Sequence, residues 1–263
     1  MRTAGTTKTD NGITWYYEQE GFGPDVVLIP DGFGDCKMFD KPMCLIAAEG
    51  FKVTTFDMPG LSRSFDSPAA TYEDVTPQKL ASYVISILDA LNIDIVTIWG
   101  CSSGGSTVLA LVADYPTRIR NALAHEVPTY EMPLLLALPS RTDDEIREAM
   151  TASIPTHFGN NGKAWEGLGE DALGRIQDNY PRWARGYIRT LGSSFPVDRE
   201  KLRGKPLEWS VGASTPTAAF FDNIVTAMEL GIPIAVIPGM YFPYVSDFED
   251  FAKYVVEKTR KYL

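Results

Sequence analysis

Ser102 lies between two glycines in the segment Gly100-Cys101-Ser102-Ser103-Gly104 of this 263-residue chain. The apolar run Ile95–Trp99 precedes the segment and predicts a strand, and the run Ser103–Tyr115 after it predicts a helix. A sharp turn from strand to helix presents a serine hydroxyl, and flanking glycines spare such a turn steric clashes with its neighbours. We therefore predict that Ser102 is a nucleophile rather than a serine that only shapes a turn.

A second glycine-bearing loop, Pro30-Asp31-Gly32-Phe33-Gly34, follows the apolar run Val26–Ile29. In hydrolases with a serine on such a turn, a loop at this place gives one backbone N–H to the oxyanion of the tetrahedral intermediate. The residue after the nucleophile gives the other. Gly32 and Ser103 are the predicted donors, and a glycine-rich turn that binds nothing is the alternative.

The general base that a serine nucleophile requires is missing from its usual place. Histidine occurs only at positions 125 and 157, whereas the base is expected on a loop after the last strand. Ile232–Ile237 is predicted as that strand, buried, and Tyr241 stands in the loop that follows it. A phenol has a pKa of about 10, so Tyr241 is not expected to accept the serine proton at neutral pH as imidazole does.

The predicted acid also departs from the usual position. The segment Gly212–Pro216, after the penultimate strand, carries no carboxylate. Glu126 ends the strand beside that of the nucleophile and is the predicted acid. The alternative is that Glu126 is only a carboxylate at the hinge of the cap. Asp57, at the end of another strand, is expected to order its own turn. Neighbours in a strand point to opposite faces, so His125 should point away from the site if Glu126 faces it. We therefore do not expect His125 to replace the base, nor His157, which lies in the expected cap.

Strands and helices alternate in two parts of the chain, which predicts a mostly parallel sheet covered on both faces and, with the serine turn, an α/β-hydrolase fold. The segment from Val127 to about Arg203 is instead helical and rich in turns. We expect a core domain of residues 1–127 and 204–263 and an inserted helical cap of residues 128–203. The expected strands are Ile13–Gln19, at the sheet edge, Val26–Ile29, Lys52–Phe56, Ile95–Trp99, Ile119–Ala124, Leu207–Val211 and Ile232–Ile237. The expected helices are Met38–Ala48, Pro77–Leu91, Ser103–Tyr115, Thr217–Leu230 and Ser246 to the terminus.

The composition restricts the partners and the compartment. A net charge of −10, scattered along the chain, argues against nucleic acid or an anionic membrane and favours a neutral small-molecule ligand. Cys36, Cys44 and Cys101 show no paired or metal-binding spacing and are expected to be small buried side chains, so no metal or cofactor is expected. Without an apolar leader or a run of about 18 apolar residues, we expect a soluble cytoplasmic protein. The spacing leaves monomer and homodimer open.

Four longer segments of the chain match a known family of enzymes. They are Asn11–Glu20, Phe56–Gly60, Trp99–Gly104, and Pro238–Met240 with Phe242–Tyr244. With these segments the chain resembles the fungal zearalenone hydrolases, lactonases of the α/β-hydrolase fold, and the resemblance covers essentially the whole chain. It implies that Ser102 attacks the macrolide ester of the mycotoxin zearalenone, that Glu126 replaces the usual aspartate, and that a histidine belongs where Tyr241 stands.

The same resemblance implies the ligand contacts. The backbone of Gly32 and Ser103 would form the oxyanion hole, and Trp183, in the cap, would hydrogen-bond the ligand. The implied pocket walls are Asp31, Pro128, Leu135, Ser153, Phe158, Tyr187, Phe221 and Phe242.

Tyr241 leads us to expect a folded, ligand-binding but severely impaired lactonase. The sequence leaves a second class of protein open, a binding module that holds an apolar phenolic ligand on the same scaffold without hydrolysing it. An esterase or epoxide hydrolase with another substrate is a weaker alternative, because an epoxide hydrolase usually carries aspartate at the position of Ser102.

Overall fold

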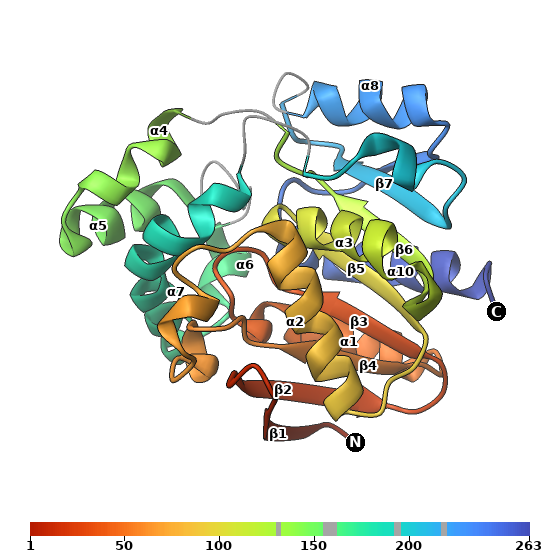
Figure 1. The fold of residues 1–263 in the computed structure, drawn as a ribbon, viewed down its shortest axis with the longest axis horizontal. Helices are drawn as coiled ribbons and strands as arrows, with labels where there is room; N and C mark the ends of the chain where they lie inside the picture. The colour runs from red at the N-terminus through yellow and green to blue at the C-terminus, as the bar shows by residue number, and fades with distance from the viewer. Residues whose placement is uncertain (130–132, 155–161, 192–195, 217–219) are drawn as a thin grey trace.

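Strands β1 to β8 form one mixed sheet through the centre of the molecule (Figure 1). The computed structural model describes residues 1–129, 133–154, 162–191, 196–216 and 220–263. The strand order is β1-β2-β4-β3-β5-β6-β7-β8, with β1 and β2 antiparallel to their neighbours and the remaining pairs parallel. The strands are β1 Thr3–Lys8, β2 Thr14–Gly21, β3 Asp25–Ile29, β4 Lys52–Phe56, β5 Val96–Cys101, β6 Ile119–His125, β7 Leu207–Gly212 and β8 Ile234–Ile237.

The expected mostly parallel sheet is confirmed, but both of its edges differ from expectation. Strand β2, expected at the edge, is covered by β1, whose residues are polar and largely exposed and so carry no apolar signal. At the opposite edge, β8 was expected to be a buried strand, yet Val236 within it is 65% exposed. The inner strands β5 and β7 are buried throughout, although β7 carries the polar side chains Glu208 and Ser210.

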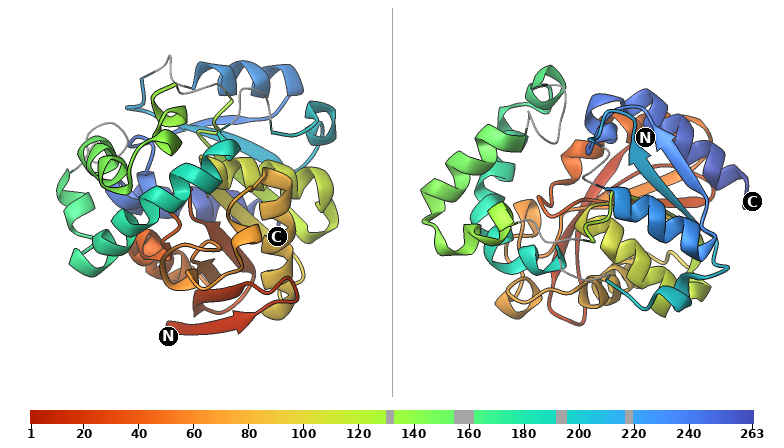
Figure 2. Two further views of the ribbon diagram at one scale, coloured as in Figure 1. Left: turned by 60° about the vertical axis from the view of Figure 1, so that its left-hand side comes forward. Right: turned by 90° about the horizontal axis from the view of Figure 1, so that it is seen from above.

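Helices cover both faces of the sheet (Figure 2). α1 packs against α10 on one face, and α2 packs against α3 on the other. No helix within the described residues is long and apolar enough to cross a membrane. The helices around the sheet are α1 Asp40–Ala48, α2 Pro77–Ala90, α3 Ser103–Asp114, α8 Phe221–Leu230, α9 Pro243–Ser246 and α10 Phe248–Arg260.

The cysteines were expected to be buried. This expectation is wrong at Cys44, which is exposed on α1, whereas Cys36 and Cys101 are buried.

Further helices lie between β6 and β7 in the sequence, beside the carboxyl ends of the central strands. α4, α5 and α7 are on the left of Figure 1. α7 continues into a π-helical turn, Trp183–Tyr187, a local irregularity that is frequent at functional sites. The helices are α4 Pro133–Leu136, α5 Asp143–Ser153, α6 Gly162–Glu166 and α7 Glu170–Arg182.

Buried polar side chains join α7 to the loops of the sheet. Asp35, fully buried after β3, forms ion pairs with Arg175 of α7 at 2.7 Å and with Arg63 at 3.2 Å. Asn179 donates to the Phe33 carbonyl oxygen at 2.6 Å and accepts from the Ser62 amide at 2.8 Å. Because a buried polar group that loses its partner is costly, these contacts fix α7 against the loop that carries Gly32.

Asn223 of α8 joins its helix to the ends of β6 and β7 in the same way, through buried hydrogen bonds. Its Oδ1 accepts from the Val127 amide and from the Trp209 indole, each at 2.8 Å, and its Nδ2 donates to the Val127 carbonyl oxygen at 2.8 Å. Val127 directly follows Glu126, so the amide of Asn223 fixes the backbone where β6 ends.

Replacing this side chain should destabilise the protein measurably. We expect Asn223→Ala to lower the free energy of unfolding by roughly 2–4 kcal/mol, because buried donors and an acceptor lose their partner. Urea denaturation measures the change. Met228→Ala on the same helix is the matched control, since Met228 is 73% exposed and should shift stability by no more than about 0.5 kcal/mol. Equal unfolding midpoints for the two variants would contradict the assigned role.

Candidate active site

Ser102 forms the junction between β5 and α3. Its backbone has φ 54° and ψ −124°, in the positive-φ region that non-glycine residues seldom adopt. Its amide donates to the His125 carbonyl oxygen at 3.0 Å, and its carbonyl oxygen accepts from the Ser106 amide at 2.9 Å. These bonds hold a strained residue in place, as is common where a side chain must be presented for chemistry.

The glycines on either side of Ser102 permit close backbone contacts. A Cβ atom on Gly100 would collide with the Gly104 carbonyl, and one on Gly104 would lie 2.9 Å from the Pro30 carbonyl oxygen. The first collision is with the backbone of α3 and the second with the end of β3, so neither can be relieved by rotating a side chain. The turn therefore requires both glycines.

Two backbone amides predicted to bind an oxyanion lie close to the serine. Ser103 is the first residue of α3, where amides have no acceptor within the helix and the helix dipole favours negative charge. Gly32 lines the same small cavity as Ser102. A Cβ atom at position 32 would collide with the Trp183 indole nitrogen, so the absence of a side chain lets that ring cover the loop.

Glu126 is fully buried where β6 ends, with φ 43°. Its Oε1 accepts from the Gly212 amide at 2.8 Å and from the Thr215 hydroxyl at 2.5 Å. The loop after β7, which carries no carboxylate, thus holds the carboxylate of the neighbouring strand. Its Oε2 is buried and has no hydrogen-bond donor among the described residues. Such an unpaired buried acceptor is rare in proteins.

Tyr241, in the loop after β8, is hydrogen-bonded through its side chain to Ser102. Burial raises the pKa of the Tyr241 hydroxyl well above its ordinary value, and the Cys101, Asp31 and Glu126 groups raise it further, whereas the Ser102 hydrogen bond lowers it. The phenol is therefore protonated at neutral pH. The backbone of Tyr241 is also held, because the Cys101 thiol donates to its carbonyl oxygen at 3.1 Å.

A cavity of about 20 Å³, which is room for about one water molecule, adjoins the Ser102 side chain. Asp31, in its wall, is 1% exposed, and its Oδ1 accepts from the Phe33 amide at 3.0 Å. Burial raises the pKa of Asp31 to about 7, an effect only partly offset by that hydrogen bond. The lining residues are Asp31, Gly32, Phe33, Ser102, Leu135, Met150, Trp183, Leu191 and Tyr241.

This geometry agrees with comparisons to known proteins. Residues 25–217 match the model of the alpha/beta hydrolase fold family. The chain is 58% identical over 264 residues to a zearalenone hydrolase of Bionectria ochroleuca, with all of both chains covered. It is 53% identical over 262 residues to a zearalenone hydrolase of Cladophialophora bantiana, covering all of this chain and 98% of that one. The chain belongs to the zearalenone hydrolase family of α/β hydrolases.

Solved structures with distant sequences share the fold of this hydrolase family member. The crystal structure of the enol-lactonase from Burkholderia xenovorans superposes with a TM-score of 0.78 at 18% identity, covering 97% of this chain and 100% of that one. At that identity, the likeness extends to the fold alone. The α/β-hydrolase fold expected from the sequence is thus confirmed by both the family match and the architecture.

Several expected pocket residues of this hydrolase lie away from the described cavity. Phe221 was expected in the wall, but it is 56% exposed at the start of α8. The Tyr187 hydroxyl is engaged with the Pro59 carbonyl oxygen at 2.7 Å, and the half-buried Ser153 donates to Ala149 within its own helix. Pro128 is buried, and the ring centroid of Phe242 lies 4.8 Å from that of Tyr241, but neither residue lines the cavity. Phe158 and His157 lie outside the described residues.

Phe33, Met150 and Leu191 line the cavity but were not singled out from the sequence. Met150 shares the buried face of α5 with Ile146, four residues earlier. That helical spacing marked a buried stripe, but only the packing of α5 against the core decides which member of the stripe reaches Ser102.

His125 lies outside the lining of this cavity. Its Nδ1 is 3.0 Å from the Ser210 hydroxyl and its Nε2 is 3.3 Å from the Met240 carbonyl oxygen, so both ring nitrogens have partners. Burial lowers the pKa of His125 despite the nearby Glu126 carboxylate, which keeps the imidazole neutral at pH 7. No group of three or more potential metal ligands occurs in the described part of the chain.

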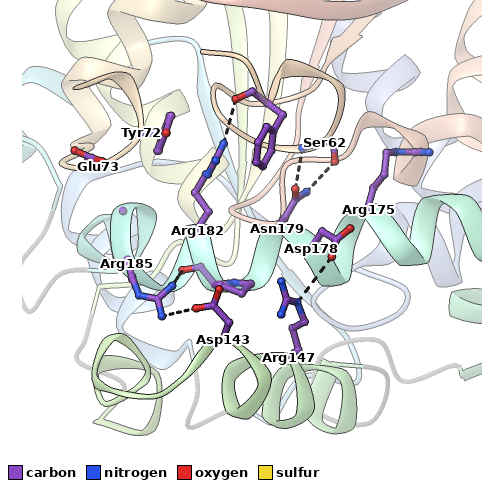
Figure 3. A pocket seen from close by; sticks show the side chains of 13 residues that line it. Ser62, Tyr72, Glu73, Asp143, Arg147, Arg175, Asp178, Asn179, Arg182 and Arg185 are labelled. Carbon is purple, nitrogen blue, oxygen red and sulfur yellow. Dashed lines mark hydrogen bonds and ion pairs between the residues drawn. The ribbon is translucent and has the colours of Figure 1, made fainter. Parts of the chain in front are cut away.

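A much larger cleft, of about 820 Å³, lies between the loop around residues 62–73 and helices α5 and α7 (Figure 3). Two of its arginines are paired with acids: Arg185 contacts Asp143 at 2.6 Å, and Arg147 contacts Asp178 at 3.8 Å. The Arg182 guanidinium stacks on Phe65 and donates to the Gly60 carbonyl oxygen at 2.6 Å. Ser102 does not line this cleft, which is a polar boundary between the inserted helices and the core.

The glycine requirement at the serine turn can be tested directly. We expect Gly100→Ala to destabilise the protein strongly, by more than about 2 kcal/mol, because the new methyl group meets backbone atoms. Gly174→Ala, within α7, is the matched control: its Cβ would have open space, so it should be neutral or stabilise the helix by up to about 1 kcal/mol. Thermal unfolding of both variants measures the difference, and similar melting temperatures would refute the steric argument.

The raised pKa of Asp31 predicts a pH-dependent stability. The folded protein holds the proton more tightly than the unfolded chain, so the contribution of Asp31 to stability is lost as pH rises from about 4 to about 7. Asp31→Asn should therefore raise the melting temperature more at pH 8 than at pH 5. Asp178→Asn, an exposed carboxylate, should show no such difference; an equal effect of Asp31→Asn at both pH values would mean an ordinary pKa.

Proposed function

We propose that this protein hydrolyses the lactone ester of zearalenone-type macrolactones, with Ser102 as nucleophile and Glu126 as the acid of the triad. The activity is severely reduced because Tyr241 occupies the position of the base. The full-length similarity to two zearalenone hydrolases supports the substrate class. The strained serine turn at the N-terminus of α3 supports the reaction type.

One observation carries the assignment of position 241 as the base position. Glu126 is held by two donors through Oε1, while its buried Oε2 lacks a donor among the described residues. The negative charge of Glu126 acts on the Tyr241 side chain, which is hydrogen-bonded to Ser102. An imidazole at position 241 would fill both roles, because one ring nitrogen could donate to Oε2 while the other accepts from the serine.

The reaction follows from these contacts. Ser102 Oγ attacks the lactone carbonyl carbon, and the amides of Gly32 and Ser103 stabilise the oxyanion, each contributing roughly 3–4 kcal/mol. The ester C–O bond then breaks, and water releases the acyl group from Ser102 as a ring-opened hydroxy acid. A missing triad member typically leaves about 10³–10⁴-fold acceleration over water, supplied by the oxyanion hole and by binding.

The helical segment 128–203 serves in this proposal as a cap over the substrate. Leu135, Met150 and Leu191 give the cavity an apolar wall, and the Trp183 indole is the donor placed nearest Gly32. A cavity of about 20 Å³ does not hold a macrolactone. Binding therefore requires the cap helices to move away from the serine turn.

A binding protein for an apolar phenolic ligand is the second candidate function. The observation that favours it is the hydrogen bond between Ser102 and a phenol that stays protonated at neutral pH. In that case the ligand would be held without loss of its ester bond.

Restoring an imidazole distinguishes the two functions. We expect Tyr241→His to raise the rate of zearalenone hydrolysis at least about 100-fold, because general base catalysis contributes roughly 10²–10⁴-fold. Chromatography of the remaining lactone measures the rate, and intrinsic tryptophan fluorescence measures binding by the unmodified chain.

Two further variants serve as controls. Ser102→Ala combined with Tyr241→His should abolish the gain, and Tyr241→Phe should not produce it. Equal robust activity in the unmodified chain and in Tyr241→His would place the base elsewhere. Binding without hydrolysis in every variant would instead support the binding protein.

A further inference from the structure

Asp31 is a buried carboxyl group with no charged partner among the residues that the structure describes. Its Oδ1 accepts from the Phe33 amide at 3.0 Å, whereas its buried Oδ2 has no donor among the described residues. It lines the same cavity as the Ser102 and Tyr241 side chains. A buried carboxyl group is normally paired with a cation or fully hydrogen-bonded, so this arrangement requires an explanation.

The groups that act electrostatically with Asp31 come from three sides and are all weak acids. They are Tyr241 and Tyr244, which follow β8, Tyr180 of α7, and Cys101 of β5. No arginine or lysine of the described residues contributes to the pKa of Asp31, which burial raises to about 7. Among the described lining residues, Asp31 is thus the group that can gain and lose a proton near neutral pH.

Asp31 lies beside the hydrogen-bonded pair that contains the nucleophile. The Ser102 and Tyr241 side chains are hydrogen-bonded, and Asp31 lines the same cavity and acts electrostatically on the Tyr241 hydroxyl. The cavity has a volume of about 20 Å³, which is room for about one water molecule. One water molecule there would complete a path for a proton from the phenol to the unpaired Oδ2 of Asp31.

We propose that Asp31 is the proton acceptor that activates Ser102 in this chain, and that the Tyr241 hydroxyl passes the proton between them. The inference rests on the proposed function, because it takes Ser102 as the nucleophile. It names the group that would accept the serine proton, and so support the reduced hydrolysis, in a chain with tyrosine at the base position.

The proton transfers balance in each step. In acylation, a bond forms between Ser102 Oγ and the lactone carbon while the serine proton moves to the Tyr241 oxygen. The phenol proton moves to the water molecule in the cavity, and that water gives one of its own protons to Asp31 Oδ2. When the ester C–O bond breaks, the proton returns along the same path to the leaving alkoxide. In deacylation, water gives its proton to Asp31 by this path, and Ser102 takes it back as the acyl bond breaks.

The test measures Ser102 reactivity without using zearalenone. A fluorophosphonate forms a P–O bond with Ser102 and releases fluoride, while the serine proton leaves through the same acceptor. Intact-protein mass spectrometry follows the rate from pH 5 to pH 9. We expect the rate to rise about 10-fold between pH 6 and pH 8 and then to level off, as titration of one group with a pKa of about 7 requires.

Three variants isolate the role of Asp31. Asp31→Asn should remove the inflection near pH 7 and lower the rate at pH 8 about 10-fold or more. Tyr241→Phe should do the same by breaking the path, whereas Asp178→Asn should keep the profile of the unmodified chain. Circular dichroism melts confirm that each variant is folded before its rate is compared.

Each other outcome overturns the proposal. These outcomes are an inflection that survives Asp31→Asn, a rate that falls as pH rises, and an absence of labelling in the unmodified chain at every pH. Failure of the proposed function is a separate result: Tyr241→His would then react with the fluorophosphonate but leave zearalenone intact. The pH profile of the unmodified chain would still decide the role of Asp31.

Discussion

The site depends on the close approach of α3 to the ends of β3 and β5. Gly100 and Gly104 make that approach possible, because a methyl group at either position would meet backbone atoms. The strained backbone of Ser102 and the position of the Ser103 amide at the start of α3 both follow from this approach. The strands on either side are buried, so the turn has no room to relax, and the strain is held by the whole sheet.

Burial determines the protonation of the groups around this turn, where no arginine or lysine of the described residues acts on Asp31. It keeps the Tyr241 phenol protonated and brings the pKa of Asp31 to about 7. It also makes the unpaired Oε2 of Glu126 an anomaly, since a donor is missing where water has no access. Asp31 and Tyr241 line one small cavity beside Ser102, and the same low polarity that perturbs them would strengthen hydrogen bonds to a developing oxyanion.

Polar contacts as well as apolar packing link the inserted helices to the core on the side of α7, where Phe33 packs against Tyr180 and Trp183. Asp35, in the loop after β3, pairs with Arg175 of α7, and Asn179 of α7 binds Phe33 and Ser62, in the loops after β3 and β4. Arginines and carboxylates line the larger cleft between α5, α7 and the loop around residues 62–73. The cavity of about 20 Å³ beside Ser102 is bounded from both sides of this interface, by Trp183 from the inserted helices and by Gly32 from the core.

The sequence by itself determined the alternation of strands and helices and the turn that carries Ser102, because apolar runs and flanking glycines are local consequences of burial and close packing. The sequence did not determine the sheet edges. Strand β1 is largely exposed and pairs with β2 through its backbone, so no pattern of apolar side chains predicts it. The tertiary structure alone decided that the Gly212 amide and the Thr215 hydroxyl hold Glu126, and that no cation of the described residues acts on Asp31. The partners of a buried carboxyl group come from distant segments, and only folding brings them together.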